Sequence, residues 1–299
     1  MASTTYTQVG AFKDISNIVE NISPYETPFQ SMIGKVKVSN TLFNWVEEDL
    51  SDVKVNAQAE GADAPAEDNS FVAERQNYTQ IFARTAKVSG SAQASRLAGD
   101  IQTMAHAVQM RSRELKRDVE FAYVGSAQTA SAGTSAAPTR KTAGYQAQVD
   151  ADNVIDAAGA AVTEDQLNEM LVRLMEVGAM PDVVMAHPRV RQGLTKALEE
   201  GRVRELGDTT RVVRAVSVYV SDVGDVEIHS NRFVRYDTTA GTGDILVFDS
   251  SMWNEAILRD TRTIDIAKNG DADEKEVLVE KGLMNRSFKS AGIITNVLG

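Results

Sequence analysis

A stretch of 32 residues in the first third of the chain, from Asn44 to Arg75, cannot supply a hydrophobic core. It carries nine acidic residues against two basic ones, so −7 of the chain's net charge of −11 falls within it. Its middle, residues 56–69 (NAQAEGADAPAEDN), has almost no large apolar side chains, and a segment of that composition cannot bury enough surface to fold on itself. We therefore expect residues 44–75 to form an acidic arm that leaves the body of the protein.

The two segments that flank the middle of this arm have the composition of β-strands. Residues 35–46 (KVKVSNTLFNWV) and 78–88 (YTQIFARTAKV) are rich in β-branched and aromatic side chains, with partial alternation. We predict that these two strands are joined by the long acidic excursion. Long loops within compact domains are usually functional or disordered, so a flexible acidic surface loop is the alternative.

The next segment, residues 91–124, has the pattern of one long amphipathic helix. At 1.5 Å per residue such a helix would be about 50 Å long. The opposite face carries a mixture of charges, which is usually a solvated face. The apolar stripe recurs at mostly three- and four-residue steps and consists of Leu97, Ile101, Met104, Ala105, Val108, Leu115, Val119 and Ala122.

The second half of the chain mixes helices and strands, which predicts an α+β fold. Seventeen of the 26 residues from Gly125 to Asp150 are Ala, Gly, Ser or Thr, so we expect a flexible connector there. A helix begins after a capping box of Thr163 and Gln166 and ends at Gly178. A second helix is expected over 188–200 and a hairpin over 216–230; further strands are expected at 182–186, 245–248, 254–258, 263–267, 277–280 and 293–297.

Composition excludes several classes of protein. There is no cysteine, so disulfides, thiolate metal sites and cysteine nucleophiles are excluded. No run of about 18 apolar residues predicts a membrane helix, and the N-terminus lacks the pattern of a secretory signal. The acidic balance argues against a nucleic-acid reader with a broad basic surface. An acidic surface instead suits a container wall to which polyanionic contents must not adhere.

No constellation of residues indicates catalysis or metal binding. The three histidines have no zinc-ligand spacing, and neither a nucleophile elbow nor a phosphate-binding glycine loop is present. The acidic turn at residues 270–276 fails as a calcium loop, because Lys275 stands where an oxygen ligand is needed. We therefore expect no catalytic residue, no cofactor and no metal. A soluble enzyme with a long lid is the alternative, and titratable residues converging in a pocket would favour it.

Five stretches of the chain, in order, resemble the major capsid proteins of tailed bacteriophages with the Hong Kong 97 phage fold, in the branch typified by the SU-ten phage. None is a catalytic motif, so the resemblance depends on their combination. The five are ISPYETPFQSMIGK (22–35), NYTQIFARTAKVSGSAQA (77–94), ELKRDVEFAYVG (114–125), RKTAGYQA (140–147) and VEIHSNRF (226–233).

The resemblance implies a division of the chain into domains. Residues 1–34 would be an N-terminal arm and residues 35–90 an extended β-hairpin loop. Residues 91–150, with the long spine helix, and residues 241–299 would form a peripheral domain. Residues 151–240 would form an axial domain at the centre of each hexamer or pentamer. An encapsulin, the shell of a cellular nanocompartment, shares this fold and is the alternative within it.

The resemblance also implies a structural function and its partners. Hexamers and pentamers would assemble in the cytoplasm of a bacterial host into the icosahedral head that encloses a double-stranded DNA genome without binding it tightly. A portal would be a partner; decoration proteins and a separate scaffolding protein are optional ones, and no membrane is involved. Because the N-terminal arm starts almost at Met1, cleavage of this chain is not expected.

Candidate contacts between subunits lie on the acidic arm and on the basic side of the expected spine helix. The arm's charge would face the basic residues of a neighbour's helix. The resemblance also allows a lysine–asparagine crosslink from the loop, for which Lys54, the only lysine between Val38 and Ala86, is the candidate, with a solvated lysine as the alternative. The arm residues are Trp45, Glu47, Glu48, Asp49, Lys54, Glu60, Asp63, Glu67 and Asp68, and the helix residues are Arg111, Arg113, Lys116 and Arg117.

Overall fold

A computed structural model describes residues 26–51, 53–61, 63–64, 71–94, 103–199, 218–221, 223–268 and 270–299. The chain separates into two compact units. Among the described residues, unit 1 holds those within 83–116 and 261–278, and unit 2 holds the rest. Four elements have residues in both units: β4 (Gln80–Ser89), α3 (Met104–Glu120), β11 (Trp253–Ile266) and β12 (Ala272–Asn285).

Unit 2 is built on a mixed seven-stranded sheet. Its strand order is β5-β13-β10-β6-β8-β7, with β9 paired to β10; the β13–β5 and β6–β8 pairs are parallel and the other pairs are antiparallel. The strands are β5 (Val154–Asp156), β6 (Val183–Ala186), β7 (Val218–Val220), β8 (Asp225–Ser230), β9 (Tyr236–Asp237), β10 (Thr242–Phe248) and β13 (Ala291–Leu298).

This sheet crosses the boundary that the resemblance implied between the axial and peripheral domains. The expected axial segment, residues 151–240, supplies β5 to β9, whereas β10 and β13 come from the expected peripheral segment, residues 241–299. The strands expected at 182–186, 245–248 and 293–297 and the β7–β8 hairpin are confirmed. Within the expected axial segment, β6, β8 and β7 pair with one another, whereas β5 pairs with β13 and β9 with β10 from the C-terminal part of the chain.

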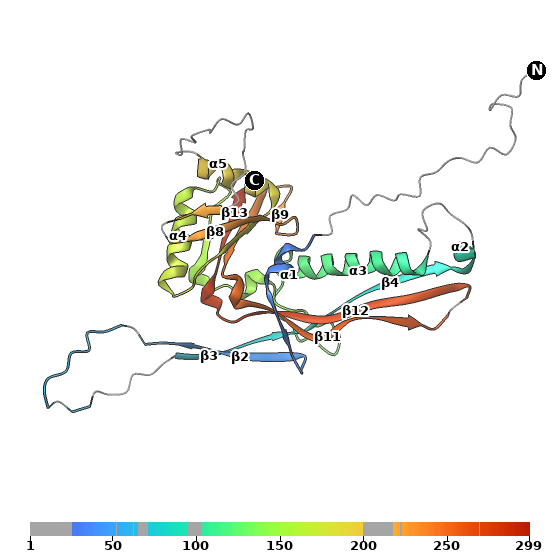
Figure 1. Cartoon of the computed structure of the whole chain (residues 1–299), viewed down its shortest axis with the longest axis horizontal. Coiled ribbons are helices and arrows are strands. Elements are labelled where there is room, and N and C mark those ends of the chain that lie inside the picture. Colours follow the sequence, from blue (N-terminus) through green and yellow to red (C-terminus); the bar gives the residue numbers. More distant parts are fainter. Residues whose placement is uncertain are drawn as a thin grey trace, which may run out of the picture. The chain divides into compact units, whose positions relative to one another are not determined.

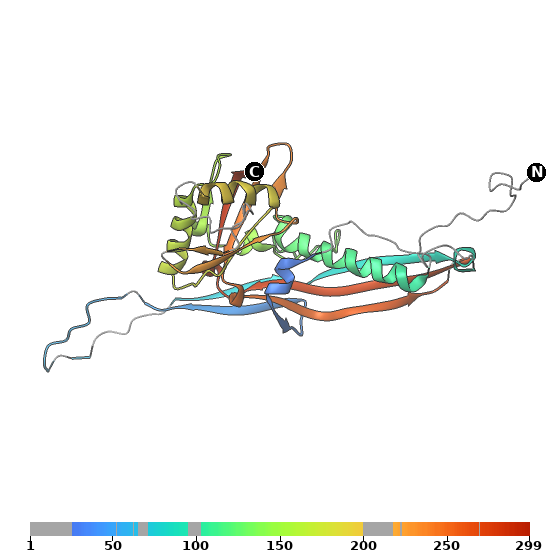
Figure 2. The same ribbon diagram turned by 45° about the horizontal axis from the view of Figure 1, so that its top comes forward.

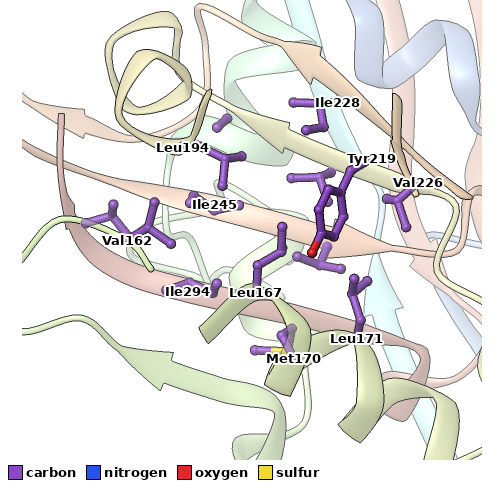
Figure 3. Close-up of a cluster of buried hydrophobic side chains, with 14 of the residues drawn as sticks. Val162, Leu167, Met170, Leu171, Leu194, Tyr219, Val226, Ile228, Ile245 and Ile294 are labelled. Carbon is purple, nitrogen blue, oxygen red and sulfur yellow. The ribbon is translucent and has the colours of Figure 1, made fainter. Parts of the chain in front are cut away.

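Two helices cover one face of the sheet, α4 (Glu164–Glu176) and α5 (Pro188–Glu199) (Figures 1 and 2). The predicted capping box is confirmed, and Gly178, with φ of +94°, follows the C-cap. Val177 follows Leu174 at the three-residue spacing of the apolar face, which predicts that it is buried; it is instead the C-cap and is half exposed. Figure 3 shows the core beneath the helices, in which Leu167, Met170 and Leu171 of α4 gather with Tyr219, Ile245 and Ile294 of the strands.

A cluster of fully buried aromatic rings includes Phe248 at the end of β10. The Phe29 ring lies 5.4 Å from that of Phe248 and 5.8 Å from that of Trp253, and Tyr145 stacks on Trp253 at 4.7 Å. Side chains alternate along a strand, so Phe248 points away from the face that Ile245 presents to the helices. Strand β10 is thus buried on both faces, which explains its continuous apolar sequence.

A four-stranded sheet has the order β1-β11-β12-β4, with β1 (Gly34–Lys37) parallel to β11. The two strands expected at 254–258 and 263–267 are one continuous strand, β11, because neither glycine nor proline interrupts it. The predicted turn before β12 contains Gly270 at φ of +85°. In unit 1, Lys87 of β4 pairs with Glu274 of β12.

The expected helix over residues 91–124 is shorter than predicted. The structure has α2 (Gly90–Ala94), a bend at Thr103 and then α3. A π-helical turn, η2 (Phe121–Gly125), follows α3 directly. Leu97 and Ile101 lie outside the described residues. Of the predicted apolar stripe, Leu115, Val119 and Ala122 are buried and Ala105 is exposed. The close approach of Gly125 to the Phe233 carbonyl, 2.3 Å from an added Cβ, explains the glycine at the end of this turn.

The expectation of a flexible connector over residues 125–150 is wrong for residues 142–148. Thr142, Ala143, Tyr145 and Gln148 are buried, and a short 3₁₀ helix, η3, spans Tyr145–Gln148. Small residues allow the backbone to pack closely here. A Cβ added at Gly144 would lie 3.0–3.1 Å from three carbonyl oxygens of residues 122–126. This close packing is confined to residues 142–148, whereas most residues from 127 to 139, which hold most of the Ala, Gly, Ser and Thr of the segment, are exposed.

We expect Gly144→Ala to lower the free energy of unfolding by about 1–3 kcal/mol, because the new methyl group displaces well-packed backbone. Gly193 is the matched control, since it lies within α5 and an added Cβ would make only an ordinary contact of 3.4 Å. Gly193→Ala should be neutral or stabilising by up to about 1 kcal/mol. Urea unfolding of both variants tests this, and equal effects would contradict the packing argument.

Candidate functional site: the acidic arm and the buried contacts at its base

The base of the acidic arm is a two-stranded antiparallel hairpin, formed by the strands labelled β2 and β3 in Figure 1. Its strands are β2 (Leu42–Asp49) and β3 (Phe71–Tyr78), in register from Leu42 opposite Tyr78 to Asp49 opposite Phe71. The strands expected at 35–46 and 78–88 therefore do not pair with each other. β3 lies within the arm, and β4 joins the four-stranded sheet instead. We did not predict β3 from the sequence, because it lies in the segment that we interpreted as an acidic arm.

One face of the hairpin base is apolar and half-buried or buried. Side chains alternate along a strand, so Phe43, Trp45 and Glu47 share the face opposite to exposed Asn44 and Val46. The Phe43 and Trp45 rings stack at 5.9 Å.

This face of the hairpin packs against Phe288 in the loop after β12. The Trp45 ring lies 6.3 Å from that of Phe288. The Arg75 guanidinium lies 4.4 Å from the centre of the same Phe288 ring, which is a cation–π geometry. Trp45, predicted as a contact between subunits, thus packs within its own chain.

Glu47, also predicted as a contact between subunits, is buried within its own chain. Its Oε2 accepts a hydrogen bond from Arg75 Nε at 2.9 Å, and its Oε1 accepts one from Ser287 Oγ at 2.7 Å. Both carboxylate oxygens are therefore occupied by the arm's second strand and by the loop after β12. Glu47 holds the base of the arm in place.

Asn77, at the end of β3, is fully buried, and its importance was missed in the sequence. We call such a residue, whose buried polar side chain bonds to several segments of the chain, a node. Its Nδ2 donates to the carbonyl of Leu283 at 2.6 Å and to Thr142 Oγ1 at 3.2 Å. Its Oδ1 accepts from the backbone amides of Ala143 at 2.8 Å and Tyr78 at 2.7 Å. One amide side chain thus joins the arm, residues 142–143 and β12. A lone asparagine at a strand end gave no signal of this.

A second node is the carboxylate of Glu280 on β12, which is 3% exposed. It accepts from Arg140 at 2.5 Å, from Arg259 Nε at 2.6 Å and from Thr79 Oγ1 at 3.0 Å. A buried carboxylate needs such partners, because an uncompensated buried charge is strongly destabilising. Thr79 lies between β3 and β4, so this node fixes the point where the chain leaves the arm.

Beyond its base, the described part of the arm is exposed and combines acidic with apolar side chains. Leu50, Val53 and Val55 are each at least 93% exposed. Lys54, Glu48, Glu60 and Asp63 are exposed as predicted, whereas Glu67, Asp68 and the side chain of Asp49 lie outside the described residues. Sequence reasoning weighed the charge of this segment and overlooked its apolar residues. Contiguous exposed apolar side chains commonly mark a contact with a partner.

The predicted basic residues of α3 already have contacts within the chain. Arg111 pairs with Glu114 at 2.6 Å, one helical turn away. The Arg117 guanidinium lies 5.8 Å from the centre of the Phe233 ring. Arg113 is half-buried and Lys116 is exposed. A contact of these four residues with another molecule stays a prediction.

Glu120, the last residue of α3, is a buried carboxylate that organises the start of unit 2. Its oxygens accept hydrogen bonds from the backbone amides of Phe29 and Gln30 at 2.8 and 3.1 Å and from Asn231 Nδ2 at 2.7 Å. It thereby caps the N-terminus of α1 (Pro28–Met32), whose own N-cap, Thr27, makes no side-chain bond. Burial raises the pKa of Glu120, and these hydrogen bonds oppose that shift.

The described residues contain no group of three or more histidine, aspartate or glutamate side chains that could hold a metal ion. Within the same part of the chain, no helix is both long and apolar enough to cross a membrane. The buried polar nodes are satisfied by neighbouring groups of the chain. Their arrangement serves to hold segments together.

Comparisons with known proteins identify relatives of this chain. The model of the family described as SU10 major capsid protein matches residues 1–298. The major capsid protein of Escherichia phage Phieco32 is 24% identical, over 99% of this chain and 97% of that protein.

Solved structures share the fold at low sequence identity. The capsid of a native GTA particle has a TM-score of 0.67 at 11% identity, covering 98% of this chain and 96% of its own. A chain from the structure of Gordonia phage Cozz has a TM-score of 0.63 at 15% identity, covering 95% of this chain and 91% of its own. The holo-SrpI encapsulin complex from Synechococcus elongatus PCC 7942 has a TM-score of 0.64 at 12% identity, covering 97% and 92%. The expected Hong Kong 97-type α+β fold is thus confirmed.

We expect Asn77→Ala to lower the free energy of unfolding by about 2–4 kcal/mol, because it leaves the buried amide of Ala143 without its partner and removes the shorter of two hydrogen bonds to the Leu283 carbonyl. Asn44 on β2 is the control, since its side chain is exposed and bonds only to Glu74. Asn44→Ala should change stability by less than about 0.5 kcal/mol. Chemical denaturation of the subunit measures both, and a small effect of Asn77→Ala would show that the node is dispensable.

Proposed function

Because this chain belongs to the SU10 major capsid protein family, we propose that many copies of it form hexamers and pentamers that close an icosahedral head around a double-stranded DNA genome. The chain is a structural capsid protein with the fold of phage capsids. The observation that carries this conclusion is the family match, which covers the chain from end to end. A structural role without catalysis is part of the proposal.

The proposal includes partners and a place of assembly. A portal would occupy one vertex, and scaffolding would come from a separate protein, with decoration proteins as optional partners. Assembly would take place in the cytoplasm of the bacterial host, and the product would be the capsid of the virion. The encapsulin fold is similar at the level of structure, whereas the family match is to a phage capsid protein. The cargo separates the two: a phage head holds DNA, whereas an encapsulin-like shell would hold protein.

Within this function, the acidic arm is the proposed contact with a neighbouring subunit. Leu50, Val53 and Val55 have no burial within their own chain, whereas the base of the arm is firmly held by Asn77 and Glu47. A rigid base with an exposed apolar end is suited to binding a second molecule. Many weak contacts of this kind are multiplied when a shell closes.

The charge of the arm suggests its counterpart. We propose that the acids of the arm face the basic side of α3 on a neighbour, which carries exposed Lys116 and half-buried Arg113. Exposed ion pairs are individually weak and are screened over about 8–10 Å at physiological salt. They would set the register of the contact, and the apolar residues would supply most of its free energy.

Deletion of residues 51–69 should leave a folded subunit that fails to form stable shells, because the hairpin base is held without them. Replacing Leu50, Val53 and Val55 together by Asp should have the same effect, since it removes the apolar contact. Size-exclusion chromatography and negative-stain microscopy measure assembly, and circular dichroism checks the fold.

The matched control for the arm replaces exposed Thr129, Ser135 and Thr139 of the 125–150 segment by Asp. It adds the same charge outside the arm and should leave assembly intact. Normal shells from the deletion variant would refute the role of the arm. Charge reversal at Arg113 and Lys116 should reproduce the arm defect if α3 is its counterpart.

The wall is expected to enclose DNA without binding it tightly. Tight non-specific binding requires several Lys or Arg contacts that release counterions, and this chain has 31 basic against 42 acidic residues. Unassembled subunits should show no shift of duplex DNA at micromolar concentration and physiological salt. Micromolar or tighter binding that weakens steeply as salt rises would instead identify a DNA-binding surface.

A further inference from the structure

The outward face of α4 is both acidic and apolar. Its inward face is buried in the core through Leu167, Met170, Leu171 and Leu174. On the opposite side, Val172 and Met175 are 44% and 48% exposed, and Met180, just beyond the helix, is 76% exposed. Among these apolar side chains lie the exposed carboxylates of Asp165, Glu169 and Glu176, four and seven residues apart and so on one side of the helix. Glu169 is paired with Arg173 one turn further on, so Asp165 and Glu176 carry the unbalanced negative charge of this face.

The outward face of α5 has the opposite charge. Its inward residues Val190, Leu194 and Leu198 are buried in the same core. Outward, Arg189, Gln192 and Lys196 are exposed at a spacing of three and four residues. Arg191, which bonds to Ser230 Oγ at 2.8 Å, adds a further cation near this face. Glu199, at the end of the helix, is the one acidic residue in the sequence of α5.

We propose that the α4 face of one subunit packs against the α5 face of a second copy of this chain, head to tail, around a capsomer. The inference rests on the proposed shell function, and it names the surfaces that meet. The charges of the two faces are complementary, and contact would bury Val172, Met175 and the neighbouring apolar residues. Each exposed ion pair is weak, so the repeated contact around a ring supplies the stability.

Two features of the structure favour this pairing over others. A symmetric contact between two α4 faces would bring carboxylates of like charge together. The exposed face of β7 and β8 offers Val218 and Val220, but it also carries Glu227, so it gives α4 no complementary charge. A contact between two different surfaces of the same unit is heterologous, and such contacts generate rings when the rotation closes.

Charge reversal in one helix at a time tests the pairing. D165K/E176K should abolish large assemblies because it sets cations of α4 against the cations of α5. R189E/K196E should do the same by setting acids against acids. The variant with all four substitutions should restore assembly, because it exchanges the charges of both faces. Size-exclusion chromatography measures assembly, and thermal denaturation shows whether each variant folds.

Engineered cysteines identify the partners directly, because the natural chain contains no cysteine. Copies with Glu176→Cys are co-expressed with tagged copies carrying Lys196→Cys, and the particles are oxidised. We expect disulfide-linked pairs of the two kinds of copy. Homodimers through position 176 would overturn the proposal, and so would the absence of crosslinks in intact particles.

The two lines of evidence distinguish this inference from the shell function. Normal assembly of both charge-reversal variants, or no rescue by the fourfold variant, would overturn the α4–α5 contact while leaving the capsid function intact. Wild-type protein that forms no particles when co-expressed with its scaffolding protein would instead refute the shell function itself.

Discussion

The structure depends on buried polar groups that find their partners far away in the sequence. Residues 142–148 run through the interior of unit 2 as irregular backbone, which is tolerated only when each amide and carbonyl is hydrogen-bonded. Asn77 bonds to the Ala143 amide and to the Leu283 carbonyl, and Gln148 bonds to the Ala143 carbonyl and to the amide of Asn285. Loss of one of these side chains leaves buried amides or carbonyls without a hydrogen bond. The acidic arm, residues 142–148 and β12 are therefore held in place by one shared set of hydrogen bonds.

This arrangement explains how one chain can combine a rigid base with a long exposed segment. The arm gains little from its own contacts, since a two-stranded hairpin is marginally stable alone. Glu47 and Trp45 fasten it through Ser287 and Phe288, and Glu280 fixes its exit at Thr79. The residues that sequence reasoning assigned to a neighbour, Trp45 and Glu47, therefore serve within the chain. The exposed residues at positions 50–55 are left for the proposed contact.

Helices and strands with a local signal were predicted well, and those that depend on distant partners were not. The α4 capping box, the helix over residues 188–199 and the β7–β8 hairpin follow from spacing of a few residues. The pairing of β2 with β3 was missed, because only the packing against Phe288 and β12 decides which strand β2 meets. Residues 142–148 were misread because small residues suit both flexible linkers and closely packed backbone.

The sequence by itself determined the family, the α+β class, the position and charge of the acidic arm and the absence of cysteine chemistry, because these depend on composition and on patterns within a few residues. Tertiary structure alone decided which polar residues are nodes. Asn77 and Glu280 look ordinary in the sequence, and they matter because folding removes their surroundings from water. It also decided that the faces of α4 and α5 point outward with opposite charge, because only packing against the sheet fixes which side of each helix remains exposed.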